Sequence, residues 1–200
     1  MIIGITGGTG CGKTTALNVI RDMGGTVIDC DAVYHQLLQS DKQLLADIEA
    51  RFPGTVENGQ LQRKKLGAIV FADPRELKAL TRITGGAIRA EVLRLLTPQP
   101  ELAAIDAIGL IEGGYGAMCD VTVAVTAPKE VRIARLMVRD GITGEYAAAR
   151  IAAQKDEAWF RENCDHVLVN DGTQEEFREK CLAFFRGLGI MNVNATIKEN

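Results

Sequence analysis

The sequence opens with a short apolar run that leads directly into a glycine-rich stretch of eight residues. This stretch, Gly7-Gly8-Thr9-Gly10-Cys11-Gly12-Lys13-Thr14, matches the pattern G-x-x-x-x-G-K-[ST]. Residues 2–6 before it predict a buried strand, and residues 13–23 after it carry apolar side chains at helical spacing. A tight turn between a strand and a helix points backbone N–H groups and the positive end of the helix dipole at a bound anion. We therefore predict a phosphate-binding loop, with contacts from Gly8, Thr9, Gly10, Cys11, Gly12, Lys13, Thr14 and Thr15.

Two side chains of this loop give it its expected chemistry. The Lys13 ammonium group is expected to reach the β- and γ-phosphates, and the Thr14 hydroxyl is expected to bind Mg²⁺. We therefore predict ATP and Mg²⁺ as cofactors, with Lys13 catalytic and Thr14 a metal ligand. The N-K-x-D motif that reads guanine in GTPases does not occur in the sequence, which favours a small-molecule kinase.

The order of the remaining segments predicts an α/β fold. Short apolar strands are expected at 2–6, 26–28, 102–108, 121–126 and 166–169. Helices are expected at 13–23, 31–39, 42–52, 63–71, 74–82, 85–96, 129–139 and 174–188, with Asn58-Gly59 and Gly85-Gly86 among the breaks. Strands that alternate with helices predict a parallel sheet of the P-loop NTPase type, with helices on both faces. The block of helices between the second and third strands is expected to form an insertion beside this sheet.

A pair of carboxylates, in Asp29-Cys30-Asp31, stands at the end of the predicted second strand. In a parallel sheet this end is expected to lie beside the phosphate-binding loop. Asp31 there is predicted to accept the proton of the acceptor hydroxyl or to hold the metal's water, which makes it a catalytic, substrate-binding and metal-site candidate. The alternative is that Asp31 only caps the helix that begins at Ala32. Asp29 is expected to play a supporting part.

Arginines recur late in the chain, where phosphoryl transfer would need mobile positive charge. Arg132, Arg135 and Arg139 are spaced to share one face of the predicted helix. Arg139 is our first choice, because it precedes the hinge-like Asp140-Gly141. A solvated basic face is the alternative. Cys11 also leaves two interpretations open, a reactive thiolate at a helix N-terminus or an inert small residue.

The composition limits the possible classes of protein. The formal net charge is −3 over 200 residues, so we expect no nucleic-acid partner. Five cysteines without a C-x-x-C pair argue against a disulfide framework and a zinc site. No apolar stretch approaches the roughly 20 residues that cross a bilayer. We therefore expect a cytoplasmic protein that binds no membrane.

Several short motifs together resemble the dephospho-CoA kinase family over about residues 1–188. The resemblance rests on the phosphate-binding loop and on short motifs that recur in the same order along the chain. These are Val27-Ile28-Asp29-Cys30-Asp31, Asn58-Gly59 with Leu61 and Arg63, Val70-Phe71, 135–141, Arg150-Ile151 with Gln154, and Asp165-His166-Val167 with Asn170. The resemblance implies transfer of the γ-phosphoryl group of ATP to the ribose 3′-hydroxyl of dephospho-CoA.

The resemblance also implies an organisation in parts. These are a nucleotide-binding core (1–30, 100–138 and 163–190), a helical acceptor domain (31–99), a lid (139–162) and a flexible tail (191–200). By the same resemblance Asp31 is the catalytic aspartate and Arg139 the lid arginine. Arg135, Arg139 and Asn170 are expected to contact ATP. The expected acceptor contacts are Asp31, Arg63, Arg89 and Asp106.

Two departures from the family pattern concern the acceptor side. Gly85-Gly86 stands where the family usually has His-Pro, and residues 106–112 lack its proline and phenylalanine but keep Asp106 and Glu112. Two alternatives to the dephospho-CoA activity therefore stay open. One is a related kinase acting on a nucleoside or another small hydroxyl compound. The other is a regulatory protein that binds nucleotide without transfer.

Overall fold

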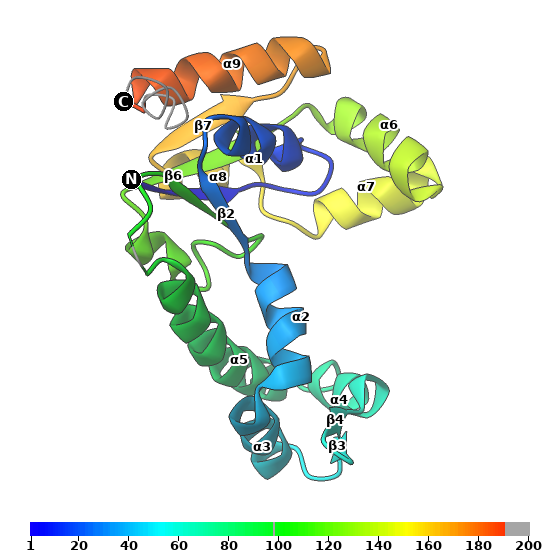
Figure 1. The fold of residues 1–200 in the computed structure, drawn as a ribbon. Helices are drawn as coiled ribbons and strands as arrows, with labels where there is room; N and C mark the ends of the chain where they lie inside the picture. The colour runs from blue at the N-terminus through cyan, green and yellow to red at the C-terminus, as the bar shows by residue number, and fades with distance from the viewer. Residues whose placement is uncertain (98, 191–200) are drawn as a thin grey trace. The chain divides into compact units, whose positions relative to one another are not determined.

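The computed structural model describes residues 1–97 and 99–190, which form two compact units (Figure 1). The first unit comprises Met1–Ile28 together with the residues from Gln99 onward, and the second comprises Asp29–Pro98. The predicted lid, 139–162, falls within the first unit, and its separate status stays a prediction. The predicted tail, 191–200, lies outside the described residues.

The first unit contains a five-stranded sheet in the order β2-β5-β1-β6-β7. Its strands are β1 Ile2–Thr6, β2 Thr26–Asp29, β5 Ala103–Asp106, β6 Val121–Thr126 and β7 His166–Val169. Its helices are α1 Lys13–Asp22, the 3-10 helix η1 Tyr115–Met118, α6 Lys129–Asp140, α7 Gly144–Ala152, α8 Glu157–Asn163 and α9 Gln174–Gly187. The pairings of β1 with β5, β1 with β6, and β6 with β7 are parallel. The predicted parallel α/β sheet is thus confirmed.

The core of this unit follows from the alternation of side chains along β1. Ile3 and Ile5 are fully buried and pack in one cluster with residues of α1 and α9, such as Leu17 and Phe177. Gly4 faces the other side, where an added Cβ would lie 2.6 Å from a methyl group of Leu110. Both faces of the sheet are therefore covered. β1 is central, so its carboxyl end opens between two neighbours, and the glycine-rich loop follows there.

The third predicted strand, 102–108, is shorter than expected. β5 ends at Asp106, and the chain then turns through Gly109 to Gly114, which has a φ of 70°.

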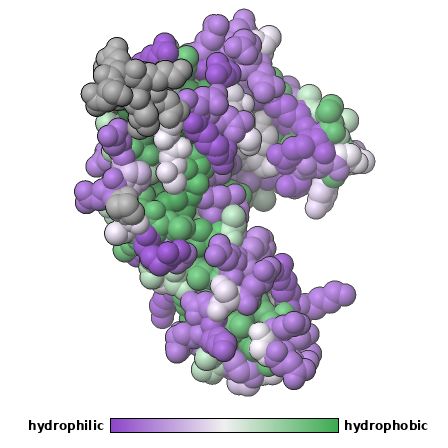
Figure 2. All heavy atoms as spheres, in the orientation of Figure 1, coloured by the Kyte–Doolittle hydropathy of each residue, from purple (hydrophilic) through white to green (hydrophobic). Residues whose placement is uncertain are grey.

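No helix of residues 1–97 and 99–190 is both long and apolar enough to cross a membrane. Hydrophilic residues cover most of the surface seen in Figure 2.

The second unit is helical. Its helices are α2 Cys30–Ser40, α3 Lys42–Arg51, α4 Arg63–Val70 and α5 Pro74–Leu95, and its two short strands are β3 Val56–Glu57 and β4 Gln60–Leu61. The strands form an antiparallel hairpin. Its turn residues Asn58 and Gly59 have φ angles of 52° and 72°, as the mirror-image turns of tight hairpins require. The sequence predicted only a break there.

The predicted break at Gly85-Gly86, within helix α5, is wrong. The helix runs through Gly85 and Gly86 without a break, and Thr84 lies inside it with its hydroxyl donating to the carbonyl of Leu80. Two glycines weaken a helix by about 1 kcal/mol each. Packing against α2, α3 and α4 offsets that cost, because Thr84, Ile88 and Val92 are buried.

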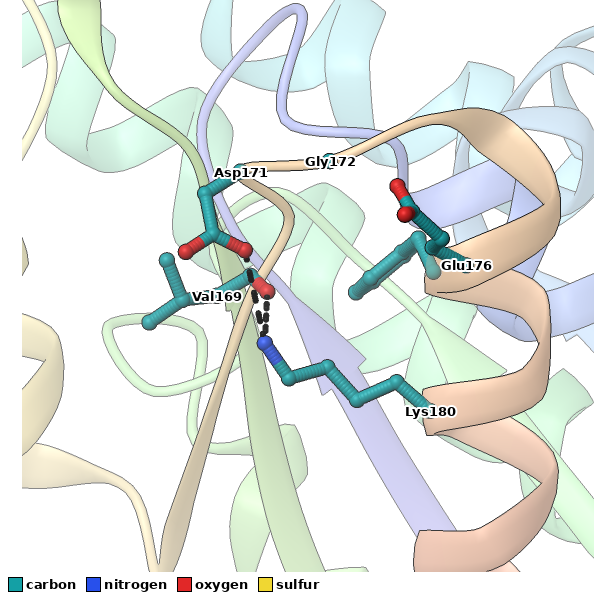
Figure 3. Close-up of a pocket in the computed structure, with 6 residues that line it drawn as sticks. Val169, Asp171, Gly172, Glu176 and Lys180 are labelled. Carbon is teal, nitrogen blue, oxygen red and sulfur yellow. Dashed lines mark hydrogen bonds and ion pairs between the residues drawn. The ribbon is translucent and has the colours of Figure 1, made fainter.

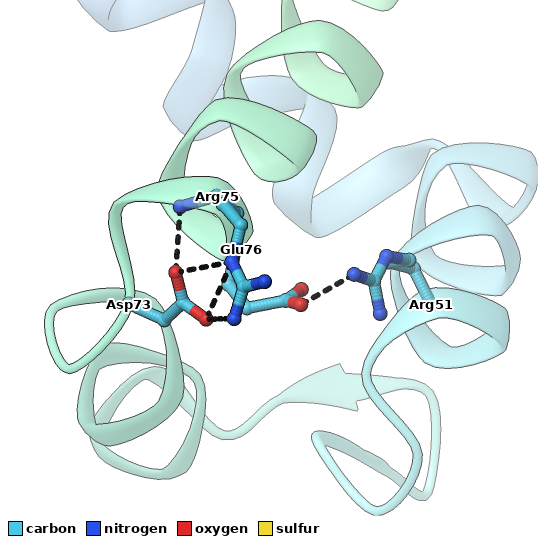
Figure 4. Close-up of polar contacts among 4 residues, drawn as sticks. All are labelled: Arg51, Asp73, Arg75 and Glu76. Atoms are coloured by element: carbon cyan, nitrogen blue, oxygen red, sulfur yellow. Dashed lines mark hydrogen bonds and ion pairs between the residues drawn. The ribbon is translucent and has the colours of Figure 1, made fainter.

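Side-chain contacts fix the start of α5 (Figure 4). Asp73 caps the helix by accepting from the backbone N–H of Arg75 at 2.8 Å, and it also accepts from the Arg75 guanidinium. Glu76, in the first turn, pairs with Arg51 at the end of α3. The cap and the ion pair together hold the N-terminus of α5 against α3.

Candidate active site

The glycine-rich loop lies between β1 and α1, as predicted. Gly7 has a φ of 136°, and a Cβ there would lie 2.1 Å from the carbonyl oxygen of Val125 in β6. Gly12 precedes α1 with a φ of 97°, in the left-handed region. Its carbonyl accepts from the N–H of Thr15 at 3.0 Å. The backbone therefore needs glycine at both ends of the turn.

The predicted phosphate ligands of the loop lie where an anion could reach them. Lys13 and Thr14 occupy the first turn of α1, whose N-terminal N–H groups no side chain caps. The Lys13 Nζ atom donates to the carbonyl of Gly7 at 2.8 Å, so the ammonium group folds back over the start of the loop. Thr14 is exposed.

Arg132 of α6 bonds to the first half of the loop. Its Nε atom donates to the carbonyl of Thr9, and its Nη2 atom donates to Oε1 of Gln154, both at 2.9 Å. The same Gln154 oxygen accepts from the backbone N–H of Thr9 at 2.9 Å. A Cβ on Gly8 would lie 2.3 Å from Nη2 of Arg132, so only glycine leaves room for this guanidinium.

Arg135, one turn further along α6, bonds to the second half of the loop. Its Nη1 atom donates to the carbonyl of Gly10 at 3.4 Å, and its Nη2 atom donates to Oδ1 of Asn170 at 3.0 Å. The Asn170 amide donates in turn to the carbonyl of Cys11 at 2.9 Å. A Cβ on Gly12 would lie 2.2 Å from the Asn170 Nδ2 atom. The structure thus brings Arg135 and Asn170, both predicted ATP contacts, onto the loop.

Arg139, the arginine predicted to be catalytic, pairs with Asp140 and not with the loop. Its Nε atom donates to Asp140 at 2.7 Å, and Arg150 donates to the other oxygen of that carboxylate at 2.8 Å. The hydrogen bond from Arg139, with that from Arg150, lowers the pKa of Asp140 to about 2. Arg139 is exposed, and its catalytic role stays a prediction. The arginines that the structure places on the loop are Arg132 and Arg135.

Cys11 lies within the loop but faces the core. Its side chain is 1% exposed and packs among the apolar residues between the sheet and α1. Burial raises the pKa of the thiol, although the positive charges of Arg132 and Lys13 act in the opposite direction. The structure therefore favours the inert small residue over the reactive thiolate.

In the Asp29-Cys30-Asp31 segment, the residue that caps the following helix is Asp29 and not Asp31. Helix α2 begins at Cys30, and Asp29 is its N-cap, since its Oδ1 atom accepts from the N–H groups of Asp31 and Ala32. The interpretation of Asp31 as the cap is therefore wrong. The exposed Asp31 side chain is left for another role, and the supporting part predicted for Asp29 takes the form of a helix cap.

Two cavities of the first unit adjoin the loop and α6. One, of about 410 Å³, is lined by Gly7, Gly8, Glu112 and Gln154 among others. The other, of about 680 Å³, lies between α6 and the start of α8 and is bordered by Arg132 and Trp159. Asp106, a predicted acceptor contact, is half-buried at the end of β5 in the same unit.

A third cavity of this unit, beyond β7, contains none of the predicted site residues (Figure 3). Lys180 of α9 reaches across it and donates to the carbonyl of Val169 at 2.7 Å, with Asp171 at 3.5 Å. The Lys180 ammonium group is therefore already bonded to protein atoms.

The helical unit has a cavity of its own, of about 180 Å³. Tyr34, His35, Phe71 and apolar residues of α2, α4 and α5 line it, and Arg63 stands at its wall. The Arg63 Nη2 atom lies 3.4 Å from Nδ1 of His35. Arg89, another predicted acceptor contact, is half-buried in α5.

A cofactor metal would have few protein ligands. Among residues 1–97 and 99–190 no three His, Cys, Asp or Glu side chains cluster as a metal site. Mg²⁺ in phosphoryl-transfer sites usually takes one or two protein ligands, with the remainder from phosphate and water. The exposed Thr14 hydroxyl in the first turn of α1 fits such a sparse site.

Comparison with known proteins identifies the family. The dephospho-CoA kinase family model matches residues 1–176. The chain belongs to the dephospho-CoA kinase family. The dephospho-CoA kinase of Geobacillus kaustophilus is 35% identical over 192 residues, which cover 93% of this chain and 96% of that protein.

Two solved structures are similar to this chain over most of its length, and one of them is a dephospho-CoA kinase. The crystal structure of TT1252 from Thermus thermophilus is 33% identical with a TM-score of 0.77, and the match covers 94% of this chain and 97% of that one. The dephospho-CoA kinase from Campylobacter jejuni is 25% identical with a TM-score of 0.68, and the match covers 94% of this chain and 96% of that one. The predicted resemblance to this kinase family is therefore confirmed.

The contacts of Arg132 and Gln154 were not predicted from the sequence. In the sequence, Arg132 is one of three arginines on a shared helical face, and Gln154 is part of a family motif. The spacing of Arg132 and Arg135 by three residues was the available signal, because it places both side chains on the face of α6 that meets the loop.

Proposed function

We propose that this member of the dephospho-CoA kinase family transfers the γ-phosphoryl group of ATP to the ribose 3′-hydroxyl of dephospho-CoA. Family membership over residues 1–176 carries the proposal. A phosphate-binding loop that keeps Lys13 and Thr14, with Arg135 and Asn170 bonded to it, supports it, because these residues supply the donor site that the transfer requires.

The donor half of the site follows from the loop. Backbone N–H groups from Gly8 to Thr15 would surround the phosphates, and the dipole of α1 adds positive potential at the same place. Lys13, whose ammonium group lies beside the Gly7 carbonyl, would bind the β- and γ-phosphates there. Thr14 and Asp31 would hold Mg²⁺, which would supply positive charge beside the phosphates when bound.

Asp31 is assigned as the general base. Its carboxylate would take the proton of the 3′-hydroxyl as that oxygen attacks the γ-phosphorus, and ADP would leave with the electron pair of the broken P–O bond. Arg139 would stabilise the charge that develops on the transferring group. Arg139 would first have to leave Asp140, which holds it in this structure.

The acceptor half is assigned to the helical unit. Dephospho-CoA carries an adenine ring and a diphosphate. The cavity lined by Tyr34 and Phe71 offers aromatic and apolar surface, and Arg63 at its wall offers a positive charge for phosphate. Arg89 and Asp106 remain proposed acceptor contacts. A cytoplasmic location, predicted from the cysteines, also belongs to this proposal.

A coupled assay of ADP release with a panel of acceptors tests the proposal. Saturable ADP release should depend on dephospho-CoA, with an equal amount of coenzyme A formed. Lys13→Ala serves as the negative control. Release that depends only on a nucleoside or another hydroxyl compound would select the related-kinase alternative. Tight ATP binding without turnover of any acceptor would select the regulatory protein.

A further inference from the structure

Arg132 is a buried cation whose hydrogen-bond partners are all neutral. The side chain belongs to a residue that is 9% exposed, and it donates to the Thr9 carbonyl and the Gln154 carboxamide. Within residues 1–97 and 99–190 it forms no ion pair, whereas Arg139 and Arg150 share Asp140. A buried charge without a counter-charge is costly unless a ligand supplies one.

The position of Arg132 on the loop indicates which ligand atoms could supply that charge. Lys13 is the side chain that serves the β- and γ-phosphates in such loops, and its Nζ atom lies 2.8 Å from the Gly7 carbonyl. The segment Gly7–Thr9 is therefore the γ-phosphate end of the loop. Arg132 meets the loop at this end, because its Nη2 atom fills the space beside Gly8.

Gln154 fixes the orientation of the guanidinium without neutralising it. Its Oε1 atom accepts from both Arg132 and the Thr9 N–H, so the carboxamide joins the helix to the loop. A glutamate could make the same two hydrogen bonds but would cancel the charge. The neutral partner leaves the positive charge of Arg132 available to an anion.

We propose that Arg132 binds the γ-phosphoryl group of ATP, with Gln154 as the positioning residue that orients it. This inference rests on the proposed kinase function and adds a donor-side arginine to Lys13, Arg135 and Arg139. It predicts that the protein distinguishes ATP from ADP partly through Arg132.

Isothermal titration of the full chain with MgATP and with MgADP tests the proposal. In Arg132→Gln the Kd for MgATP should rise about tenfold to a hundredfold, the value of a lost hydrogen bond to a charged group. The Kd for MgADP should change by no more than about threefold, because only the γ-phosphoryl contact is removed. Arg132→Lys keeps the charge and should lose less ATP affinity than Arg132→Gln.

Gln154→Glu separates the proposed role from a purely mechanical one. This variant keeps both hydrogen bonds and gives the buried guanidinium a partner, so its Tm should equal or exceed that of the wild type. Its Kd for MgATP should nevertheless rise more than its Kd for MgADP. Arg161→Gln is the matched control, because it removes an exposed arginine that pairs with Glu157 in the same unit. It should leave both Kd values unchanged.

Equal changes in the two Kd values for Arg132→Gln and Gln154→Glu would overturn the proposal and reduce Arg132 to a brace of the loop. If Arg132→Gln does not fold, Arg132→Lys and Gln154→Glu decide the question: unchanged ATP preference in Gln154→Glu, or a loss in Arg132→Lys that is equal for both nucleotides, would contradict it. Failure of the wild type to phosphorylate dephospho-CoA would refute the proposed acceptor only, since these readouts measure donor binding.

Discussion

At the scale of single residues, the glycines of the loop are needed for different reasons. Gly7 is constrained by the backbone, since Val125 leaves no space for a side chain beside it. Gly8 and Gly12 instead leave room for polar side chains from distant segments, the guanidinium of Arg132 and the amide of Asn170. The motif therefore forms a tight turn and also leaves space for two side chains from other parts of the sequence.

Asp31 gives the first residue-level prediction. Asp31→Asn should lower kcat by about 10²- to 10⁴-fold, the usual value of a positioned general base. The melting temperature should change little, because the side chain is exposed and Asp29 caps α2. The Kd for ATP measured without Mg²⁺ should stay unchanged, because the proposed contacts of Asp31 are with the acceptor and the metal. The coupled assay gives kcat, and calorimetry gives the Kd for ATP.

Asp41→Asn is a suitable control for this variant. It changes the N-cap of α3 to an equally good capping residue, so kcat and the Kd for ATP should both stay unchanged. A normal kcat in Asp31→Asn would remove Asp31 from the mechanism.

Cys11 gives a second residue-level prediction. A thiol that is 1% exposed, with a pKa raised by burial, should resist alkylation in the folded protein at pH 8. Mass spectrometry after iodoacetamide treatment should find Cys11 unmodified with or without MgATP, and modified once urea unfolds the chain. Rapid labelling that MgATP suppresses would restore the reactive-thiolate interpretation.

At the scale of elements, α6 organises the donor site. One helix places Arg132 and Arg135 on successive turns, and each bonds to a different carbonyl of the loop. Its C-terminus is closed by Gly141 in the left-handed region, with a φ of 65°. One face of α6 thus donates hydrogen bonds to the loop, while Arg139 in the last turn pairs with Asp140.

Two glycines in open surroundings allow a matched test of helix energetics. An added Cβ meets nothing within 4 Å at either Gly86, inside α5, or Gly141, after α6. Gly86→Ala should therefore increase the free energy of unfolding by about 0.5–1 kcal/mol, since alanine favours the helix. Gly141→Ala should decrease it by about 1 kcal/mol, because alanine is strained at a positive φ.

Urea denaturation of both variants gives the two free energies. A loss of stability in Gly86→Ala would contradict the continuous helix through Gly85 and Gly86. A gain in Gly141→Ala would contradict the left-handed end of α6.

At the scale of the whole molecule, carboxylates with lowered pKa values occur in both units. Hydrogen bonds lower the pKa of Asp140 to about 2, and others lower the pKa values of Asp165 and, in the helical unit, Glu49. A carboxyl group whose pKa is lower in the folded protein stabilises it above the unfolded pKa. That contribution is lost as the pH falls through the folded pKa.

The urea midpoint should therefore be level above about pH 5 and should fall between about pH 4 and pH 2. Asp165→Asn should reduce the slope of this fall, since Asp165 accepts from both the hydroxyl and the N–H of Thr122. A midpoint that stays constant down to pH 2.5 would contradict the prediction, as would an unchanged slope in the variant.

The sequence predicted the features that local patterns encode. The loop, the parallel sheet and the family depend on glycine spacing, apolar runs and short motifs, and all three are confirmed. The break at Gly85-Gly86 was wrong, because tertiary packing of α5 overrides the weak helix propensity of glycine. The bonds from Arg132 and Asn170 to the loop could not be predicted, since they join residues 123 and 159 positions apart.

These separations have a consequence for synthesis on the ribosome. Residues 29–98 form a contiguous unit, so all of its partners are present before β5 is made. β1 instead pairs with Ala103–Asp106 and Val121–Thr126, and its loop waits for Asn170. Long-range pairing of this kind is slow, and domains tend to fold as units during synthesis. The helical insertion is therefore the part able to fold first, and the nucleotide loop, although translated earliest, is among the last parts to become ordered.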